Sequence, residues 1–176
     1  MQLLIKQRVF SWSDSYDIMD EAGTVRYRVK GEIFSFGHRL HVYDAVTGEE
    51  IGMLRQKVWA WMPTFYIDFG GQTVGTVRRQ FAFFRQVYDI DVDDLHIEGD
   101  AFGWDYDVIG GEHVLMHITK KLWTWGDTYV LDVVDPSQER LALMLVLAID
   151  AANCTHDDHK NKESPQRALS ADFLIN

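Results

Sequence analysis

The sequence has 176 residues, of which 47% are hydrophobic and 13% aromatic, so it is long and apolar enough to form one domain with a substantial core. A formal net charge of −10 argues against bulk nucleic-acid binding, which requires a basic surface. The single cysteine, Cys154, excludes an intrachain disulfide and favours a reducing compartment, and no segment resembles a signal peptide or a membrane-spanning helix. We therefore expect a cytoplasmic protein that is not integral to a membrane.

Most of the chain shows the pattern of short strands separated by turn signals. In residues 24–30, apolar side chains alternate strictly with basic ones, which is typical of a strand with one buried face. The dipeptides Gly70-Gly71 and Gly110-Gly111 are typical of tight hairpin turns. The expected strands cover residues 3–10, 15–20, 24–30, 39–43, 50–57, 64–69, 72–79, 86–92, 95–98, 106–109, 113–119 and 128–133.

One strong helix is predicted near the end of the chain, at about residues 138–152. Leu141 to Ile149 is apolar without interruption and rich in strong helix formers, and Asp135-Pro136-Ser137 is a typical helix start. A helix that is apolar on every face must be buried on every face, and this one is too short to span a bilayer, which needs about 20 apolar residues. We expect a domain over residues 1–154, followed by a polar, mobile tail over residues 155–176.

An internal repeat supports an arrangement for these elements. Residues 57–68 align without gaps to residues 121–132, and Lys, both Trp, Thr and Asp are identical. Two upstream matches occur in the same order: residues 15–18 with 87–90, and residues 31–34 with 99–102. Two similar halves followed by one apolar helix predict a mainly β fold, a closed barrel of about twelve antiparallel strands around the helix, since a barrel of that width cannot be filled by its own side chains.

The chain resembles the LURP-one-related family of the tubby C-terminal-like superfamily. The resemblance rests on motifs in a fixed order over about residues 2–153: Leu3-Leu4-Ile5-Lys6-Gln7, Tyr16-Asp17-Ile18, Arg39-Leu40-His41-Val42-Tyr43-Asp44, Gly52-Met53-Leu54 and the apolar helix Leu141–Ile149. It implies a twelve-stranded barrel around a central helix, which agrees with the interpretation from the repeat. The bacterial members of the family are the expected relatives.

No residue pattern indicates catalysis, a metal site or a cofactor. Motifs for phosphate binding or for an activated nucleophile are absent, and Cys154 is better explained as a packed or incidental thiol than as a nucleophile. Two groups of residues could suggest a metal site. The acidic side chains Asp89, Asp91, Asp93 and Asp94 fit a solvated strand face better than a calcium site, because the glycine and glutamate of an EF-hand loop are missing. His156 and His159 lie in the polar tail, where little would fix a metal geometry.

Basic strand residues are the candidate ligand-binding set. In tubby proteins, Lys and Arg on the barrel exterior bind a phosphoinositide headgroup, so the resemblance implies the same chemistry here, with charge-assisted hydrogen bonds to phosphate. Ordinary outward-facing charge is the simpler explanation. The candidates are Arg26, Arg28, Lys30, Arg55, Lys57, Arg78, Arg79, Lys120 and Lys121.

The repeated Trp pairs are a second candidate surface. If Trp59, Trp61, Trp123 and Trp125 were exposed at a barrel rim, they would dock on a membrane interface or a partner. Their presence in both copies favours instead a structural role, in which they cover barrel ends or pack between strands. The predicted function is a non-enzymatic binding module for a phospholipid or phosphoinositide-like headgroup or a membrane surface, with peripheral membrane location. The alternative is a protein-interaction domain without a lipid role.

Overall fold

The computed structural model describes residues 1–6, 15–32, 37–80, 87–101, 103–123 and 126–162. Twelve strands are followed by a short 3-10 helix and one α-helix, in the order that the turn signals predict. The strands are β1 (Gln2–Lys6), β2 (Ser15–Asp20), β3 (Val25–Gly31), β4 (Arg39–Asp44), β5 (Glu50–Gln56), β6 (Thr64–Phe69), β7 (Gln72–Gln80), β8 (Val87–Val92), β9 (Leu95–Asp100), β10 (Asp105–Gly110), β11 (His113–Trp123) and β12 (Gly126–Val133).

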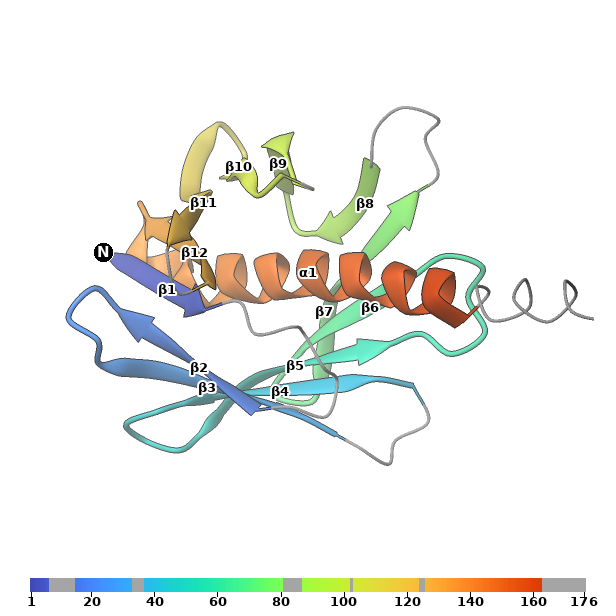
Figure 1. The fold of residues 1–176 in the computed structure, drawn as a ribbon, viewed down its shortest axis with the longest axis horizontal. Coiled ribbons are helices and arrows are strands. Elements are labelled where there is room, and N and C mark those ends of the chain that lie inside the picture. The colour runs from blue at the N-terminus through green and yellow to red at the C-terminus, as the bar shows by residue number, and fades with distance from the viewer. Residues whose placement is uncertain (7–14, 33–36, 81–86, 102, 124–125, 163–176) are drawn as a thin grey trace, which may run out of the picture.

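All twelve strands belong to one antiparallel sheet that curls into a nearly closed barrel (Figure 1). The sheet order is β8-β7-β6-β5-β4-β3-β2-β1-β12-β11-β10-β9, so the N-terminal strand β1 lies between β2 and β12. The two edges of the sheet are β8 and β9, which follow one another in the chain through Asp93 and Asp94. The predicted barrel is therefore confirmed, with one seam.

The seam lies where the two halves of the sequence repeat differ in strand pairing. The three matches equate β2 with β8, the end of β3 with the end of β9, and β6 with β12. The strand before β6 and the strand before β12 each form a hairpin with it, since β5 pairs with β6 and β11 pairs with β12. β2 also pairs with β3. Their equivalents β8 and β9 are instead the unpaired edges, so the second half of the barrel opens where the first half is closed.

The helix α1 (Glu139–Lys162) runs through the middle of the barrel (Figure 1). It follows the 3-10 turn η1 (Pro136–Gln138), at whose start the Asp135 carboxylate accepts a hydrogen bond from the Ser137 backbone N–H at 2.9 Å. The helix starts where the sequence predicts, but it continues beyond the expected end near residue 152. No glycine or proline occurs after Asn153 before Pro165, so no residue there breaks the helix. The rest of the predicted tail, residues 163–176, lies outside the described residues.

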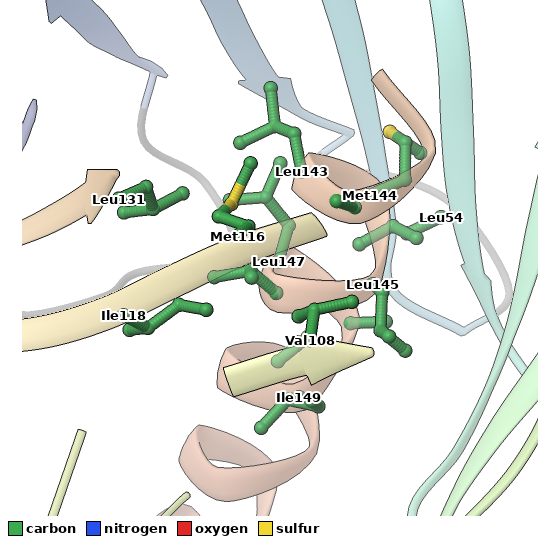
Figure 2. Close-up of a cluster of buried hydrophobic side chains, with 14 of the residues drawn as sticks. Leu54, Val108, Met116, Ile118, Leu131, Leu143, Met144, Leu145, Leu147 and Ile149 are labelled. Carbon is green, nitrogen blue, oxygen red and sulfur yellow. The ribbon is translucent and has the colours of Figure 1, made fainter. Parts of the chain in front are cut away.

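Every side chain of α1 from Ala142 to Ile149 is buried, which confirms the central-helix prediction. Figure 2 shows Leu143, Met144, Leu145, Leu147 and Ile149 of the helix among core side chains from four strands. These strand side chains are Leu54 of β5, Val108 of β10, Met116 and Ile118 of β11, and Leu131 of β12. Because strands on several sides contact the helix, its apolar residues are needed around its whole circumference.

Candidate docking surface

The connection between β5 and β6, residues 57–63, carries the most exposed large apolar side chains that the structure describes. The relative exposure of Trp59 is 93% and that of Trp61 is 102%, while Val58 between Lys57 and Trp59 is 39% exposed. The connection is closed at its base, where the Lys57 backbone N–H donates to the Thr64 carbonyl at 2.8 Å. We call residues 57–61 the tryptophan loop.

The structural role expected for the first Trp pair is wrong. Residues 57–63 form turns rather than a strand, so the period-two pattern that would place Trp59 and Trp61 on one sheet face does not apply. Trp59 has a φ of 64°, in the left-handed region that a large side chain rarely adopts. For the second pair, Trp125 and the side chain of Trp123 lie outside the described residues.

Basic residues of β3 lie on the outer face or near a strand end. Arg28 is exposed, with its Nε 3.7 Å from an Asp17 carboxylate oxygen. The Nζ of Lys30 lies 5.1 Å from the centre of the Tyr43 ring, within reach of a cation–π interaction. Arg26 is half-buried at the beginning of the strand. Two of the three cations thus already have a partner within the barrel wall.

Arg55 of β5 is the most extensively bound of the candidates. Its Nε and one terminal nitrogen lie 3.1 Å and 3.4 Å from the two carboxylate oxygens of Asp68, which is buried. The Thr73 hydroxyl donates to the same carboxylate at 2.6 Å, and the guanidinium lies over the Tyr66 ring, 4.7 Å from its centre. This arrangement gives Arg55 a structural partner, whereas Lys57 two positions later is exposed in the tryptophan loop.

Arg78 and Arg79 of β7 face opposite sides of the barrel wall. Arg78 is exposed and lies 3.7 Å from the Asp89 carboxylate on β8. Arg79 is buried, only 9% exposed, on the interior face that it shares with Val77. On β11, Lys120 and Lys121 are both exposed.

The structure does not gather these nine residues into one patch. They occupy strands β3, β5, β7 and β11 and the tryptophan loop, and β4 and β6 separate the first three strands from one another. Between β3 and β11 lie β2, β1 and β12. A further cation that sequence reasoning missed is Arg39 of β4, which lies directly opposite Arg55 in the ladder and is paired with Glu32 at 3.3 Å. Only the register, which the sequence alone does not specify, brings Arg39 and Arg55 together.

The two ends of the barrel differ in charge. Because the strands alternate in direction, successive connections lie at opposite ends. The end where α1 begins has the connections 21–24, 45–49, 70–71, 93–94, 111–112 and 134–138, which contain acidic residues but no Lys or Arg. We call it the acidic end; its connections carry Glu21, Glu49, Asp93, Asp94, Glu112 and Asp135. The tryptophan loop lies at the opposite end of the barrel. Strand β5 starts at the acidic end, after residues 45–49, and the tryptophan loop follows the other end of that strand.

No helix within the described residues is both long enough and apolar enough to cross a membrane. The apolar stretch of α1 is instead enclosed by strands.

Comparison with known proteins agrees with this architecture. The chain is 27% identical over 158 residues to the uncharacterized protein YxjI of Bacillus subtilis (strain 168), covering 90% of this chain and 97% of that protein. The X-ray structure of the Arabidopsis thaliana protein AT5G01750 has the same fold, with a TM-score of 0.57 at 16% identity, covering 85% of this chain and 89% of that one. The sequence model of the LURP-one-related family matches residues 1–150 of this chain. From this match, and from the barrel with its enclosed helix, we conclude that the chain belongs to the LURP-one-related family.

Proposed function

We propose that this protein is a non-enzymatic binding module that docks on a membrane surface through the tryptophan loop. The observation that carries the proposal is the almost complete exposure of Trp59 and Trp61 beside Lys57. Trp side chains favour the membrane–water interface, where the ring contacts acyl chains and the indole N–H remains hydrated. A lysine beside them can reach lipid phosphates with its flexible stem.

The charge distribution supports one orientation on the membrane. The acidic end would be repelled by anionic lipids, and it lies opposite the tryptophan loop. Since the whole chain carries a net charge of −10, insertion of the Trp rings supplies most of the binding free energy and Lys57 adds a smaller electrostatic part.

Vesicle co-sedimentation with phosphatidylcholine containing a fifth of anionic phosphatidylglycerol tests this proposal. We expect the double variant Trp59→Ala/Trp61→Ala to bind at least about tenfold more weakly, because each indole would bury a large apolar area. The matched control is Val46→Ala, which removes another exposed apolar side chain, 87% exposed, at the acidic end. Equal binding by both variants, or no binding by the unmodified protein, would refute the proposal.

Recognition of a lipid headgroup by exposed members of the basic set is a finer proposal, which concerns the outer barrel wall rather than the tryptophan loop. Vesicles that contain a phosphoinositide should bind more tightly than vesicles of equal charge made with phosphatidylglycerol, and rising salt should weaken this preference. The double variant Arg26→Ala/Arg28→Ala should reduce it. Equal affinity for both lipids would refute headgroup recognition and leave membrane docking through Trp59 and Trp61 as the proposal.

The second candidate is a protein-interaction domain without a lipid role, and the same Trp pair favours it because exposed Trp side chains are frequent hot spots of protein interfaces. An affinity pull-down that recovers one stoichiometric partner, lost in Trp59→Ala/Trp61→Ala, would support this candidate. Vesicle binding without such a partner would support membrane docking.

A further inference from the structure

A group of polar side chains lies inside the barrel and includes none of the exposed side chains of the tryptophan loop, although the Arg79 backbone N–H donates to the Pro63 carbonyl at 3.0 Å. Arg79 of β7 and Tyr88 of β8 are directly opposite one another in the ladder. The relative exposure of Arg79 is only 9%. The Tyr88 hydroxyl donates a hydrogen bond to the Asn153 side-chain oxygen of α1. The helix and the edge strand β8 are therefore joined by a side-chain hydrogen bond at this point.

Two hydrogen-bonding groups of this region have no partner. The Tyr106 hydroxyl of β10 is buried, and the residue as a whole is 3% exposed. No described residue accepts a hydrogen bond from this hydroxyl or donates one to it. The side-chain nitrogen of Asn153 is equally buried and also lacks a partner among the described residues. Such groups cost about 1–3 kcal/mol each when water or a ligand does not satisfy them. We call Arg79, Tyr88, Tyr106 and Asn153 the seam cluster, because they lie beside the edge strands.

The electrostatics indicate that these groups share one environment. Burial raises the pKa of Tyr88 to about 12, and the Arg79 charge acts in the opposite direction on the same hydroxyl. Burial also raises the pKa of Tyr106 well above its usual range, with further contributions from the Asp150 carboxylate and from Tyr88. Asp150 lies three residues before Asn153 and so on the same side of α1.

The two unsatisfied groups are the Asn153 amide nitrogen, which is a donor, and the Tyr106 hydroxyl, which can also donate, so one acceptor can serve both. The Arg79 guanidinium makes no ion pair within 4.0 Å and no side-chain hydrogen bond with the part of the chain that the structure describes. A buried guanidinium, an amide NH2 and a phenol O–H together can surround an oxygen anion. The nearby Asp150 carboxylate would repel a second negative charge, so a single charge suits the site better than a double one.

We propose that the seam cluster binds the monoanionic oxygen group of a small ligand, a carboxylate or a phosphate diester, inside the barrel. Arg79 supplies the charge-assisted hydrogen bonds, and Tyr106 and Asn153 donate from β10 and α1. The unpaired edges β8 and β9 let the ligand enter, because no backbone ladder holds them together. This site is independent of membrane docking, since none of its residues belongs to the tryptophan loop.

Titration with sodium acetate and with dimethyl phosphate, at constant ionic strength, tests the site. We expect saturable shifts of the Asn153 side-chain amide signals in NMR spectra, and the tighter-binding probe then distinguishes a carboxylate from a phosphate diester. Sodium sulfate, a dianion, should bind more weakly than either probe. Arg79→Met should abolish saturable binding, whereas the control Arg140→Met, which removes the same charge from an exposed position at the start of α1, should leave it unchanged.

Tyr106→Phe provides a second variant that retains the core volume and should fold even if Arg79→Met does not. It should weaken the tighter-binding probe by about tenfold or more, because a hydrogen bond to a charged group is lost. Absence of saturable shifts with both monoanions would overturn the proposal, and so would equal affinities of the unmodified protein, Tyr106→Phe and Arg79→Met.

Discussion

The hydroxyl oxygen of Tyr27 lies 2.6 Å from a carboxylate oxygen of Glu139, so β3 is joined to the first residue of the central helix through a buried hydrogen bond. Both residues are almost fully buried, at 4% and 6% exposure. The Glu139 carboxylate also lies in the first turn of α1, where the helix dipole favours negative charge. Arg140, the next residue, lies 3.6 Å from the Asp44 carboxylate at the end of β4. These contacts hold the start of α1, just before its apolar stretch, against β3 and β4.

Removing the Tyr27 hydroxyl should destabilise the fold. Tyr27→Phe leaves the Glu139 carboxylate buried without its donor, and we expect the free energy of unfolding to fall by about 1–3 kcal/mol. Urea denaturation followed by circular dichroism measures the change. Tyr66→Phe is the control, because Tyr66 makes no hydroxyl hydrogen bond among the described residues and should change stability by less than about 0.5 kcal/mol. Equal losses in the two variants would contradict the role of this hydrogen bond.

Stability should fall in the alkaline range. Burial, followed by the Glu139 hydrogen bond, raises the pKa of Tyr27 from 10.0 to about 12, and burial raises the pKa of Tyr88 to about 12. The folded protein therefore retains protons that the unfolded chain releases above pH 10. The stabilisation is complete below pH 10 and is lost as the pH rises through about 12, at up to about 1.4 kcal/mol per pH unit for each tyrosine.

The measurement is the free energy of unfolding in urea at intervals between pH 9 and pH 12. The slope should be shallower in Tyr27→Phe than in the unmodified protein, because one of the titrating groups is gone. A flat profile between pH 10 and pH 12, or an unchanged slope in the variant, would show that the two hydroxyl groups do not titrate as their surroundings imply.

Arg55 should contribute more to stability than Arg28, although both were candidate ligand-binding residues. Arg55→Met leaves the buried Asp68 carboxylate with the Thr73 hydroxyl as its remaining side-chain partner, and we expect a loss of about 1–3 kcal/mol after allowing for the partial exposure of Arg55. Arg28→Met breaks an exposed pair with Asp17 and should cost less than about 1 kcal/mol. Chemical denaturation of both variants tests the difference, and a smaller loss for Arg55→Met would argue that its pair with Asp68 is not structural.

A carboxylate in the middle of the apolar stretch of α1 should prevent folding. Leu145 is fully buried in the middle of α1, so Leu145→Asp places a carboxylate where no described polar group surrounds it, and we expect an unfolded or aggregated protein. The milder Leu145→Ala should fold with a loss of about 2–5 kcal/mol. Val134→Asp, at a position that is 51% exposed just before the helix, is the matched control and should fold normally. A well-folded, soluble Leu145→Asp protein would contradict the central position of the helix.

The candidate surfaces show where sequence reasoning was limited. The alternation in residues 24–30 correctly separated the buried Tyr27 and Val29 from the exposed Arg28, because a strand has a strict period of two. The same rule requires that Arg78 and Arg79 face opposite sides, but it does not reveal which one faces the interior near a strand end. The Trp residues of 57–63 lie in turns, to which no period applies, so the structure rather than the pattern determined their exposure.

The sequence by itself determined the twelve strands, their turns and the enclosure of the Leu141–Ile149 helix, because these depend on local backbone preferences and on a side-chain pattern that only burial on all sides explains. The tertiary structure decided which distant segments meet. The seam between β8 and β9 depends on pairing across the whole chain, as do the opposition of Arg79 to Tyr88 and the hydrogen bond from Tyr88 to Asn153. Equivalent halves of the repeat can differ in such pairing, since backbone hydrogen bonds form only where the curvature of the closed sheet brings the edges within reach.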